Sequence, residues 1–262
     1  MSRKPLTPRL RKRWDALIAS DGALIGLSDC HVLLENKLVN DVFYRGTFKG
    51  LPCIVKCSSR APESILNEYE LGRRLHQADP VHFPAVYACH AGPMAFVVSE
   101  FIEGGRSLAD DPSDRYADEV LAILDTLYKS DVVHRDIFAP NFLIASDGHL
   151  KLIDCQFAVD MRTKKIDPWL EAHPKYHFAT FAAFITREFA FWDDAAFAQK
   201  LLPSLLTRAE PLIGRLRFEL RFKASVRIRL CLLTVSLHLQ RLFHRRGSCK
   251  WSAIVRRLER FK

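Results

Sequence analysis

Several features that define other classes of protein are missing from this sequence of 262 residues. The N-terminus is charged and has no apolar core segment, so we expect no signal peptide. The seven cysteines are scattered, and no two pairs of them have the spacing of zinc ligands. We therefore expect reduced thiols and a cytoplasmic protein, not a disulfide-rich or zinc-binding one.

Long apolar runs, internal repeats and low-complexity segments are also missing. Residues 228–237 are nearly apolar, but the run is too short to cross a bilayer and is interrupted by Arg229 and ended by His238. What the chain does have is a hydrophobic content of 48%, which is enough for a sizeable core. Its length suits one bilobal domain or two small ones.

The net charge of +9 is divided unevenly along the chain. Residues 1–13 contain six Lys/Arg and no acids, and residues 208–262 contain fifteen Lys/Arg and three acids, a net charge of +12. Residues 14–207 contain eighteen Lys/Arg and twenty-seven acids, a net charge of −9. Basic ends on an acidic body indicate an anionic partner.

The basic region from about residue 208 has two competing interpretations. Its leucines, isoleucines and valines alternate with arginines, which is typical of helices packed on a larger lobe with the arginines in solvent. The same pattern is typical of an amphipathic surface that docks on anionic lipid. Nucleic acid is the least favoured partner, because no nucleic-acid motif is present and aromatic residues are not interleaved as a stacking platform.

The strongest chemical signal is the segment His-Arg-Asp-Ile-Phe-Ala-Pro-Asn at residues 134–141. Asp154 follows Asn141 by thirteen residues, directly after an apolar run. Asp136 can orient an attacking hydroxyl and accept its proton, whereas Asn141 and Asp154 can hold Mg²⁺ against the phosphates of ATP. A lone His-Arg-Asp tripeptide occurs often by chance, so the interpretation depends on the flanking strands and on the matches that follow.

With these residues in place, the chain resembles the eukaryotic-like protein kinase superfamily from about residue 38 to about residue 160. Cys-Ile-Val-Lys at residues 53–56 is similar to the family's Val-Ala-Ile-Lys, and residues 65–71 have the pattern of a helix. The resemblance implies that Lys56 contacts the α and β phosphates and is paired with Glu68, with Glu70 as the alternative partner. It also implies that Arg135 braces the catalytic loop.

A buried-strand pattern at residues 95–102, followed by Glu-Gly-Gly, is similar to the family's hinge. The resemblance implies that the backbone of Glu100 and of Ile102 contacts the adenine of ATP. Apolar residues at helical spacing in residues 116–129 predict a helix that leads into the catalytic loop.

The chain also departs from the family at three motifs. The glycine-rich loop aligns with residues 35–41, which contain no glycine, and Asp-Phe-Gly is replaced by Asp154-Cys155-Gln156. The Ala-Pro-Glu motif that braces a peptide-substrate platform has no match. Asp193 or Asp194 is expected either to support the catalytic loop or simply to cap a helix.

Strands first and helices afterwards fit an α+β arrangement with a nucleotide cleft between two lobes. The resemblance implies that this arrangement is the bilobal protein-kinase-like fold. We expect a basic N-terminal extension at residues 1–35, with a short helix near 14–18. A β-rich N-lobe is expected at 36–102, with strands near 38–45, 50–57, 83–90 and 94–101. The larger, helical C-lobe is expected at 103–262 and includes the basic region.

The leading hypothesis is therefore an ATP- and Mg²⁺-dependent kinase, a transferase of the γ-phosphate to a hydroxyl. Asp136 would be the catalytic base and Asn141 and Asp154 the metal ligands, while Lys56 would neutralise phosphate charge. Losing a metal ligand should be severe, because catalysis in this family is mostly positioning and electrostatics.

The acceptor has several candidates. The small size and the charge distribution are most similar to bacterial lipopolysaccharide-core Kdo/heptose kinases, which implies a core sugar or another membrane-associated glycolipid at the inner face of the cytoplasmic membrane. A serine/threonine protein kinase is the alternative, because His-Arg-Asp with Arg135 is the protein-kinase form of the loop. Aminoglycoside-type kinases rank third. A hypothesis of another class is a pseudokinase that acts as a nucleotide- or partner-binding module.

Overall fold

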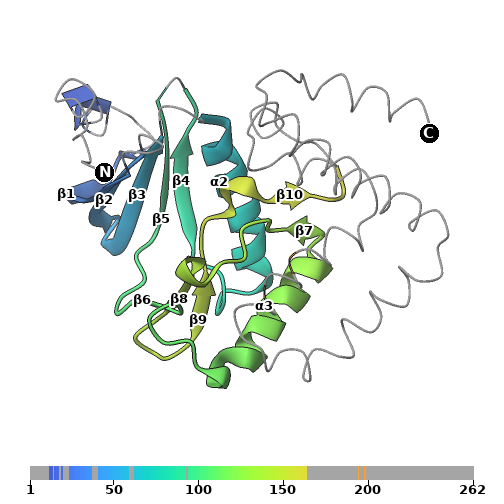
Figure 1. Ribbon diagram of the computed structural model, residues 1–262. Helices are drawn as coiled ribbons and strands as arrows, with labels where there is room; N and C mark the ends of the chain where they lie inside the picture. The colour runs from blue at the N-terminus through green and yellow to red at the C-terminus, as the bar shows by residue number, and fades with distance from the viewer. Residues whose placement is uncertain are drawn as a thin grey trace, which may run out of the picture. The chain divides into compact units, whose positions relative to one another are not determined.

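The computed structural model describes residues 12–13, 15–17, 19, 24–36, 41–58, 62–92, 94–163, 194 and 198. All of these lie within residues 1–214, the first of the two units into which the chain divides. In the described residues, the part of the chain from 27 to 100 forms a sheet and one helix. The following part forms short strands, short 3₁₀ helices and one longer helix (Figure 1). The predicted α+β class is thereby confirmed.

The N-terminal part is a five-stranded antiparallel sheet with the strand order β1-β2-β3-β5-β4. Its strands are β1 (Leu27–Asn36), β2 (Asp41–Phe48), β3 (Leu51–Ser58), β4 (Val86–His90) and β5 (Ala95–Glu100). Lys49 and Gly50 join β2 to β3, and both have positive φ angles, of 51° and 83°. Two such residues are what a tight hairpin turn of type I′ requires, so this turn fixes the register of Phe48 opposite Leu51.

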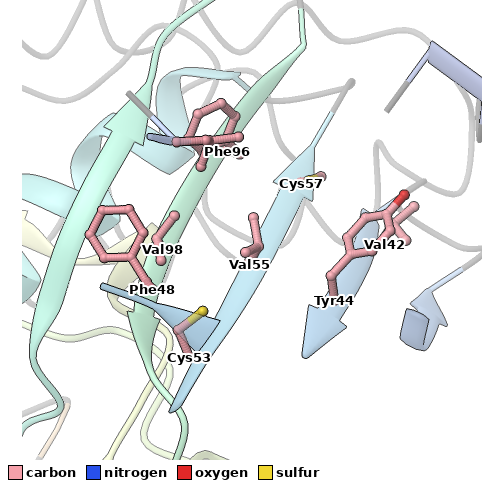
Figure 2. Close-up of a cluster of buried hydrophobic side chains, with 9 residues drawn as sticks. Val42, Tyr44, Phe48, Cys53, Val55, Cys57, Phe96 and Val98 are labelled. Carbon is pink, nitrogen blue, oxygen red and sulfur yellow. The ribbon is translucent and has the colours of Figure 1, made fainter. Parts of the chain in front are cut away.

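The two faces of the sheet bury different sets of side chains. One face carries a core of nine residues, most of which Figure 2 labels: Leu24, Val42, Tyr44, Phe48, Cys53, Val55, Cys57, Phe96 and Val98. On the other face Ala95 and Val97 pack with Ile65 of helix α2 (Pro62–Ala78). Because strand side chains alternate between faces, Lys56 lies on the α2 side of β3, opposite Val97.

The sheet begins earlier than the sequence predicts. Strand β1 pairs with β2 along its length, although residues 27–35 fall in the segment interpreted as an N-terminal extension. The register shifts twice, between Ser28 and His31 and between Val32 and Leu34. Such bulges break the alternation of apolar and polar residues by which a strand is recognised, and they leave Leu33 and Leu34 both exposed. Further upstream, residues 12–13, 15–17 and 19 are helical, around the predicted short helix.

The C-terminal part that the structure describes is built on helix α3 (Ala117–Lys129), which follows the short 3₁₀ helix η2 (Asp114–Tyr116). Its apolar residues recur at helical spacing and are buried: Ala117, Val120, Ile123, Leu124 and Leu127. The helix predicted over residues 116–129 is therefore confirmed, and it leads directly into the segment that carries the chemistry.

Short strands flank the segments that contain Asp136, Asn141 and Asp154. Strands β6 (Arg106–Ser107), β8 (Phe142–Ile144) and β9 (Leu150–Leu152) form one small sheet, and β7 (Val132–Val133) pairs with β10 (Val159–Asp160) in another. Between β7 and β8 lies the loop with the 3₁₀ helix η3 (Ala139–Asn141), and β9 leads to η4 (Cys155–Phe157). Within the described residues no helix is both long and apolar enough to cross a membrane. The basic region from about residue 208, which the sequence assigns to the C-lobe, lies outside them.

Candidate active site

Lys56 of β3 is the centre of a buried ionic cluster. Its Nζ lies 2.8 Å from Glu68 Oε2 of α2 and 2.7 Å from Asp154 Oδ1, and only 7% of its side chain is exposed. Burial alone would lower the pKa of Lys56, but the negative charges of Asp154 and Glu68 outweigh burial and raise the pKa well above its usual value. The ammonium is therefore charged at every physiological pH.

The structure brings together the lysine and the first-choice glutamate of the sequence analysis. Glu68 is partly buried on α2, whereas Glu70, the alternative partner, is exposed. The residues come together because Lys56 points to the α2 face of the sheet and Glu68 to the sheet face of α2. Breaking such a buried pair is costly, because the partner left behind is an uncompensated charge.

Asp154 and Gln156 are the partners of Lys56 that come from the chain after β9. Asp154 has a left-handed backbone conformation, with φ of 69°, at the start of η4. Gln156 Oε1 accepts a hydrogen bond from Lys56 Nζ at 3.0 Å, and Gln156 Nε2 donates one to Asp154 Oδ2 at 3.2 Å. The side-chain amide of Gln156 therefore joins the lysine to the carboxylate.

Asn67 is a structural residue that the sequence analysis does not identify. Its Nδ2 donates to the carbonyl oxygens of Cys155, Gln156 and Ala158, at 3.4, 3.1 and 2.7 Å. A helical asparagine carries no sequence signal for such contacts, because its partners lie about ninety residues away. Asn67 fixes the backbone of the turn on which Asp154 stands.

The thiol of Cys155 is also buried beside this cluster. Burial raises its pKa, and the charges of Glu68 and Asp154 act in the same direction. The thiol therefore stays protonated and is not a nucleophile at neutral pH.

In the catalytic loop, Asp136 and Asn141 are in direct contact. Asn141 Nδ2 donates to both the backbone oxygen and Oδ2 of Asp136, each at 2.8 Å. Asp194 fixes the backbone of the loop. Its two carboxylate oxygens accept hydrogen bonds from the backbone N–H groups of His134 and Arg135, at 2.6 and 2.8 Å. Of the two aspartates considered from sequence, Asp194 thus supports the loop, and Asp193 lies outside the described residues.

The remaining loop residues are constrained by burial and by backbone geometry. Arg135 has a positive φ of 72°, a conformation that the two bonds to Asp194 help to maintain. His134 is fully buried, and burial lowers its pKa below 6.5, so the imidazole is neutral at pH 7. The backbone N–H of Asp136 donates to His134 Nδ1 at 3.3 Å, which orients the ring.

Four of the polar side chains of the cluster and the loop line a cavity of about 720 Å³. The polar end includes Lys56, Glu68, Asn141 and Asp154, and the rest is mainly apolar, lined among others by Phe43, Ile54, Val97, Ile102 and Leu143. A mostly apolar cavity with a few convergent polar groups is typical of a small-molecule site. This one has an apolar part suited to a planar base and a charged part suited to phosphates.

The two expected hinge residues both line this cavity. The carboxylate of Glu100 is engaged elsewhere, because it accepts hydrogen bonds from the Ala85 N–H at 2.9 Å and from Lys151 at 3.2 Å. The carbonyl of Ile102 accepts from Gly105 N–H at 3.2 Å, which forms the turn at the Gly-Gly pair. Any contact of Glu100 with a nucleotide is therefore left to its backbone.

The donor set at the polar end fits Mg²⁺. Within the described residues no three or more His, Cys, Asp or Glu side chains are grouped as a metal cage. Mg²⁺ does not need one, because it is usually bound through one or two carboxylates together with substrate phosphates and water. Asp154 and Asn141 offer carboxylate and carboxamide oxygens at the same end of the cavity as Lys56.

Comparison with known proteins agrees with this geometry. The family model of the protein kinase domain matches residues 55–178. The probable serine/threonine protein kinase IREH1 of Arabidopsis thaliana is 31% identical over 47% of this chain and 10% of its own length. The Arabidopsis thaliana serine/threonine-protein kinases AGC1-7 and AGC1-5 are 26% and 28% identical over 71% and 75% of this chain, and over 37% of their own length in each case.

The fold is thus a bilobal, α+β protein-kinase-like fold, as the sequence predicts. The matches support the protein-kinase-like superfamily and, as the class of protein, a kinase phosphotransferase. This chain spans between about a tenth and about two fifths of the length of the three relatives. All three are named as serine/threonine protein kinases, the first of them as a probable one.

Proposed function

We propose that the protein is an ATP- and Mg²⁺-dependent kinase that transfers the γ-phosphate of ATP to a serine or threonine hydroxyl of a protein. The observation that carries this proposal is the buried cluster of Lys56, Glu68 and Asp154, which shares one cavity with Asn141. Asn141 in turn contacts Asp136. The serine/threonine protein kinases among the relatives support the class of acceptor.

In this proposal each end of the cavity binds one part of ATP. The apolar part receives the adenine, with the backbone of Glu100 and Ile102 at its edge. Lys56 provides a fixed positive charge for the phosphates, and Glu68 keeps its ammonium in place. When bound, Mg²⁺ offsets the negative charge that develops on the transferred phosphoryl group. Asn141 and Asp154 would hold the metal.

Asp136 acts on the acceptor. Its carboxylate is buried except for 8% of the residue's surface, and Asn141 holds Oδ2 in a fixed orientation. A hydroxyl that donates to this carboxylate is directed towards the phosphates. Asp136 receives its proton as the hydroxyl oxygen bonds to the γ-phosphorus and the bond from that phosphorus to the departing ADP oxygen breaks. Catalysis of this kind consists mainly of positioning, so it depends on the rigidity of the loop that Asp194 supports.

A membrane-associated glycolipid is the second candidate acceptor. The observation in its favour is the net charge of +12 in residues 208–262, together with the missing match to the Ala-Pro-Glu motif. A basic amphipathic region is attracted to anionic head groups, which would bring the protein to the inner face of the cytoplasmic membrane. Peripheral membrane contact and cytoplasmic location belong to this proposal.

The acceptor is identified by following label from [γ-³²P]ATP. The full chain is incubated with Mg²⁺ and either a mixture of serine- and threonine-containing peptides or lipopolysaccharide-core glycolipids. Label in the peptides supports the main proposal, and label only in the glycolipids replaces it with the second.

ATP binding is measured alongside, as the thermal shift that Mg²⁺ and ATP produce in the parent protein and in Asp154→Ala. A shift that Asp154→Ala abolishes supports the proposed metal site. No transfer and no shift in the parent would favour the pseudokinase, a partner-binding module without this chemistry.

A further inference from the structure

Gln156 accepts the third hydrogen bond of the Lys56 ammonium, the group proposed to bind the phosphates of the nucleotide. A lysine ammonium has three donors and no more. Here one is given to Glu68 Oε2 at 2.8 Å, one to Asp154 Oδ1 at 2.7 Å and one to Gln156 Oε1 at 3.0 Å. No donor is left for a phosphate oxygen.

The same side chain also occupies Asp154. Gln156 Nε2 donates to Asp154 Oδ2 at 3.2 Å, while Oδ1 of that carboxylate accepts from Lys56. The amide therefore presents an acceptor to the lysine, as a phosphate oxygen would, and a donor to the aspartate, where a cation would be attracted. Lys56 and Asp154, the two partners of this amide, both line the cavity, whereas Gln156 itself is not among the lining residues.

We propose that Gln156 is a built-in competitor of Mg²⁺-ATP, because its amide occupies both the phosphate-binding donor of Lys56 and one oxygen of Asp154 until the nucleotide displaces it. Among the three partners of Lys56, Gln156 is the uncharged one and has the longest hydrogen bond. It is the partner that can be given up at least cost, since bonds between two charged groups are stronger.

Displacement needs only the side chain of Gln156 to move. The backbone around it is fixed, because Asn67 binds the carbonyls of Cys155, Gln156 and Ala158. The amide can turn away by rotation about its own torsions while Asp154 stays in place for the metal. The residues of the site are therefore in place, while one donor of Lys56 and one oxygen of Asp154 are engaged by a rotatable group.

The amide stabilises the protein without nucleotide for the same reason that it weakens nucleotide binding. Lys56 is buried, and leaving a buried donor without an acceptor is unfavourable. The sequence pattern also makes the inference specific to this chain, because the glycine of the family's Asp-Phe-Gly motif has no side chain with which to form this contact.

This inference rests on the proposed nucleotide site, and it predicts the sign of a change in affinity. Gln156→Ala and Gln156→Met remove the amide, and Met retains the length of the side chain. Both variants should bind ATP about tenfold more tightly than the parent in the presence of Mg²⁺, measured by titration calorimetry of the full chain. Both should also have a lower melting temperature without nucleotide. Gln77→Ala, at an exposed position near the end of α2, is the matched control and should change neither.

Each outcome bears on the inference. If the parent binds Mg²⁺-ATP and both variants bind it equally or more weakly, Gln156 is not a competitor, although the proposed function stands. If Gln156→Ala gains affinity but Gln156→Met does not, the amide hydrogen bonds are irrelevant and the inference fails in favour of simple steric relief. If neither the parent nor a variant binds Mg²⁺-ATP, both the inference and the proposed function are wrong.

Discussion

The ionic cluster around Lys56 and the catalytic loop around Asp136 are built by opposite means. The cluster joins side chains from β3, α2 and the turn after β9, and full charges hold it together. The loop is compact in sequence, with Asp136 and Asn141 five residues apart, and its two bonds to Asp194 are made by backbone N–H groups. Changes in the cluster should therefore act on binding and stability together, whereas changes at Asp136 should act on the chemical step alone.

The sharpest test of this contrast is Asp136→Asn. The new amide keeps an oxygen that Asn141 can bind, so the loop should keep its conformation, but the variant cannot accept the hydroxyl proton. We expect turnover to fall by about 100- to 10,000-fold, the usual contribution of a positioned base, with ATP affinity and melting temperature unchanged. Asp147→Asn, at an exposed position in the β8–β9 turn, serves as the control. Full activity in Asp136→Asn would mean that this aspartate is not the base.

Asp194→Ala tests how far the loop depends on its support. The change removes two charge-assisted hydrogen bonds to buried backbone N–H groups, each worth about 1.5–3 kcal/mol. We expect a loss of about 3 kcal/mol in the free energy of unfolding, measured by urea denaturation, together with reduced turnover. The control Asp110→Ala, at an exposed position, should lose no more than about 0.5 kcal/mol. Equal losses in the two variants would show that Asp194 does not support the loop.

Glu68→Ala and Glu70→Ala compare the observed partner of Lys56 with the alternative glutamate on the same helix. Glu68 has 15% of its side chain exposed, and removing it leaves the Lys56 ammonium without one of its two counter-charges. We expect a loss of about 2 kcal/mol in the free energy of unfolding and at least tenfold weaker ATP binding in Glu68→Ala. Glu70→Ala should resemble the parent in both denaturation and calorimetry. A larger effect of Glu70→Ala than of Glu68→Ala would show that Glu68 is not the functional partner of Lys56.

The pH dependence of stability should carry a signature of His134. Burial lowers the pKa of this imidazole below 6.5, so below that pH the unfolded chain binds the proton more readily than the folded one. Its contribution to stability is therefore present above pH 6.5 and is lost as the pH falls towards its folded pKa, at about 1.4 kcal/mol per pH unit at most. Denaturation midpoints of His134→Gln between pH 7.5 and 5 should fall less steeply than those of the parent. The control is His31→Gln, at an exposed position of β1.

The two regions also differ in how far sequence alone reveals them. The catalytic loop is readable because its residues are consecutive, and Asp154 because it follows an apolar strand at a fixed distance. The pairing of Lys56 with Glu68 came from a resemblance, and the alternation of side chains on β3 explains it. Asn67 carries no such signal, because its partners are brought close only by the packing of α2 on the η4 turn. The contact of Gln156 with Lys56 is equally hidden, because it joins residues 100 positions apart in the sequence.

Strand β1 shows a different limit. Its two bulges place Leu33 and Leu34 both in exposed positions, so the period of two by which strands are recognised is lost. The segment is a strand because β2 offers a hydrogen-bonding edge, which is a property of the sheet and not of residues 27–36 themselves.

Helix α2 carries two contacts to the chain that follows β9, from Asn67 to the carbonyl of Ala158 and from Arg74, whose Nη1 lies 2.6 Å from Asp160 Oδ2. Its Glu68 pairs with Lys56 of β3. Asn67 and Glu68 are neighbours on one helix, so a displacement of α2 away from the sheet would weaken both contacts. Such a displacement would loosen the backbone of the proposed metal-binding turn and remove the counter-charge of Lys56 together. A partner that displaces α2 would therefore act on both halves of the site at once.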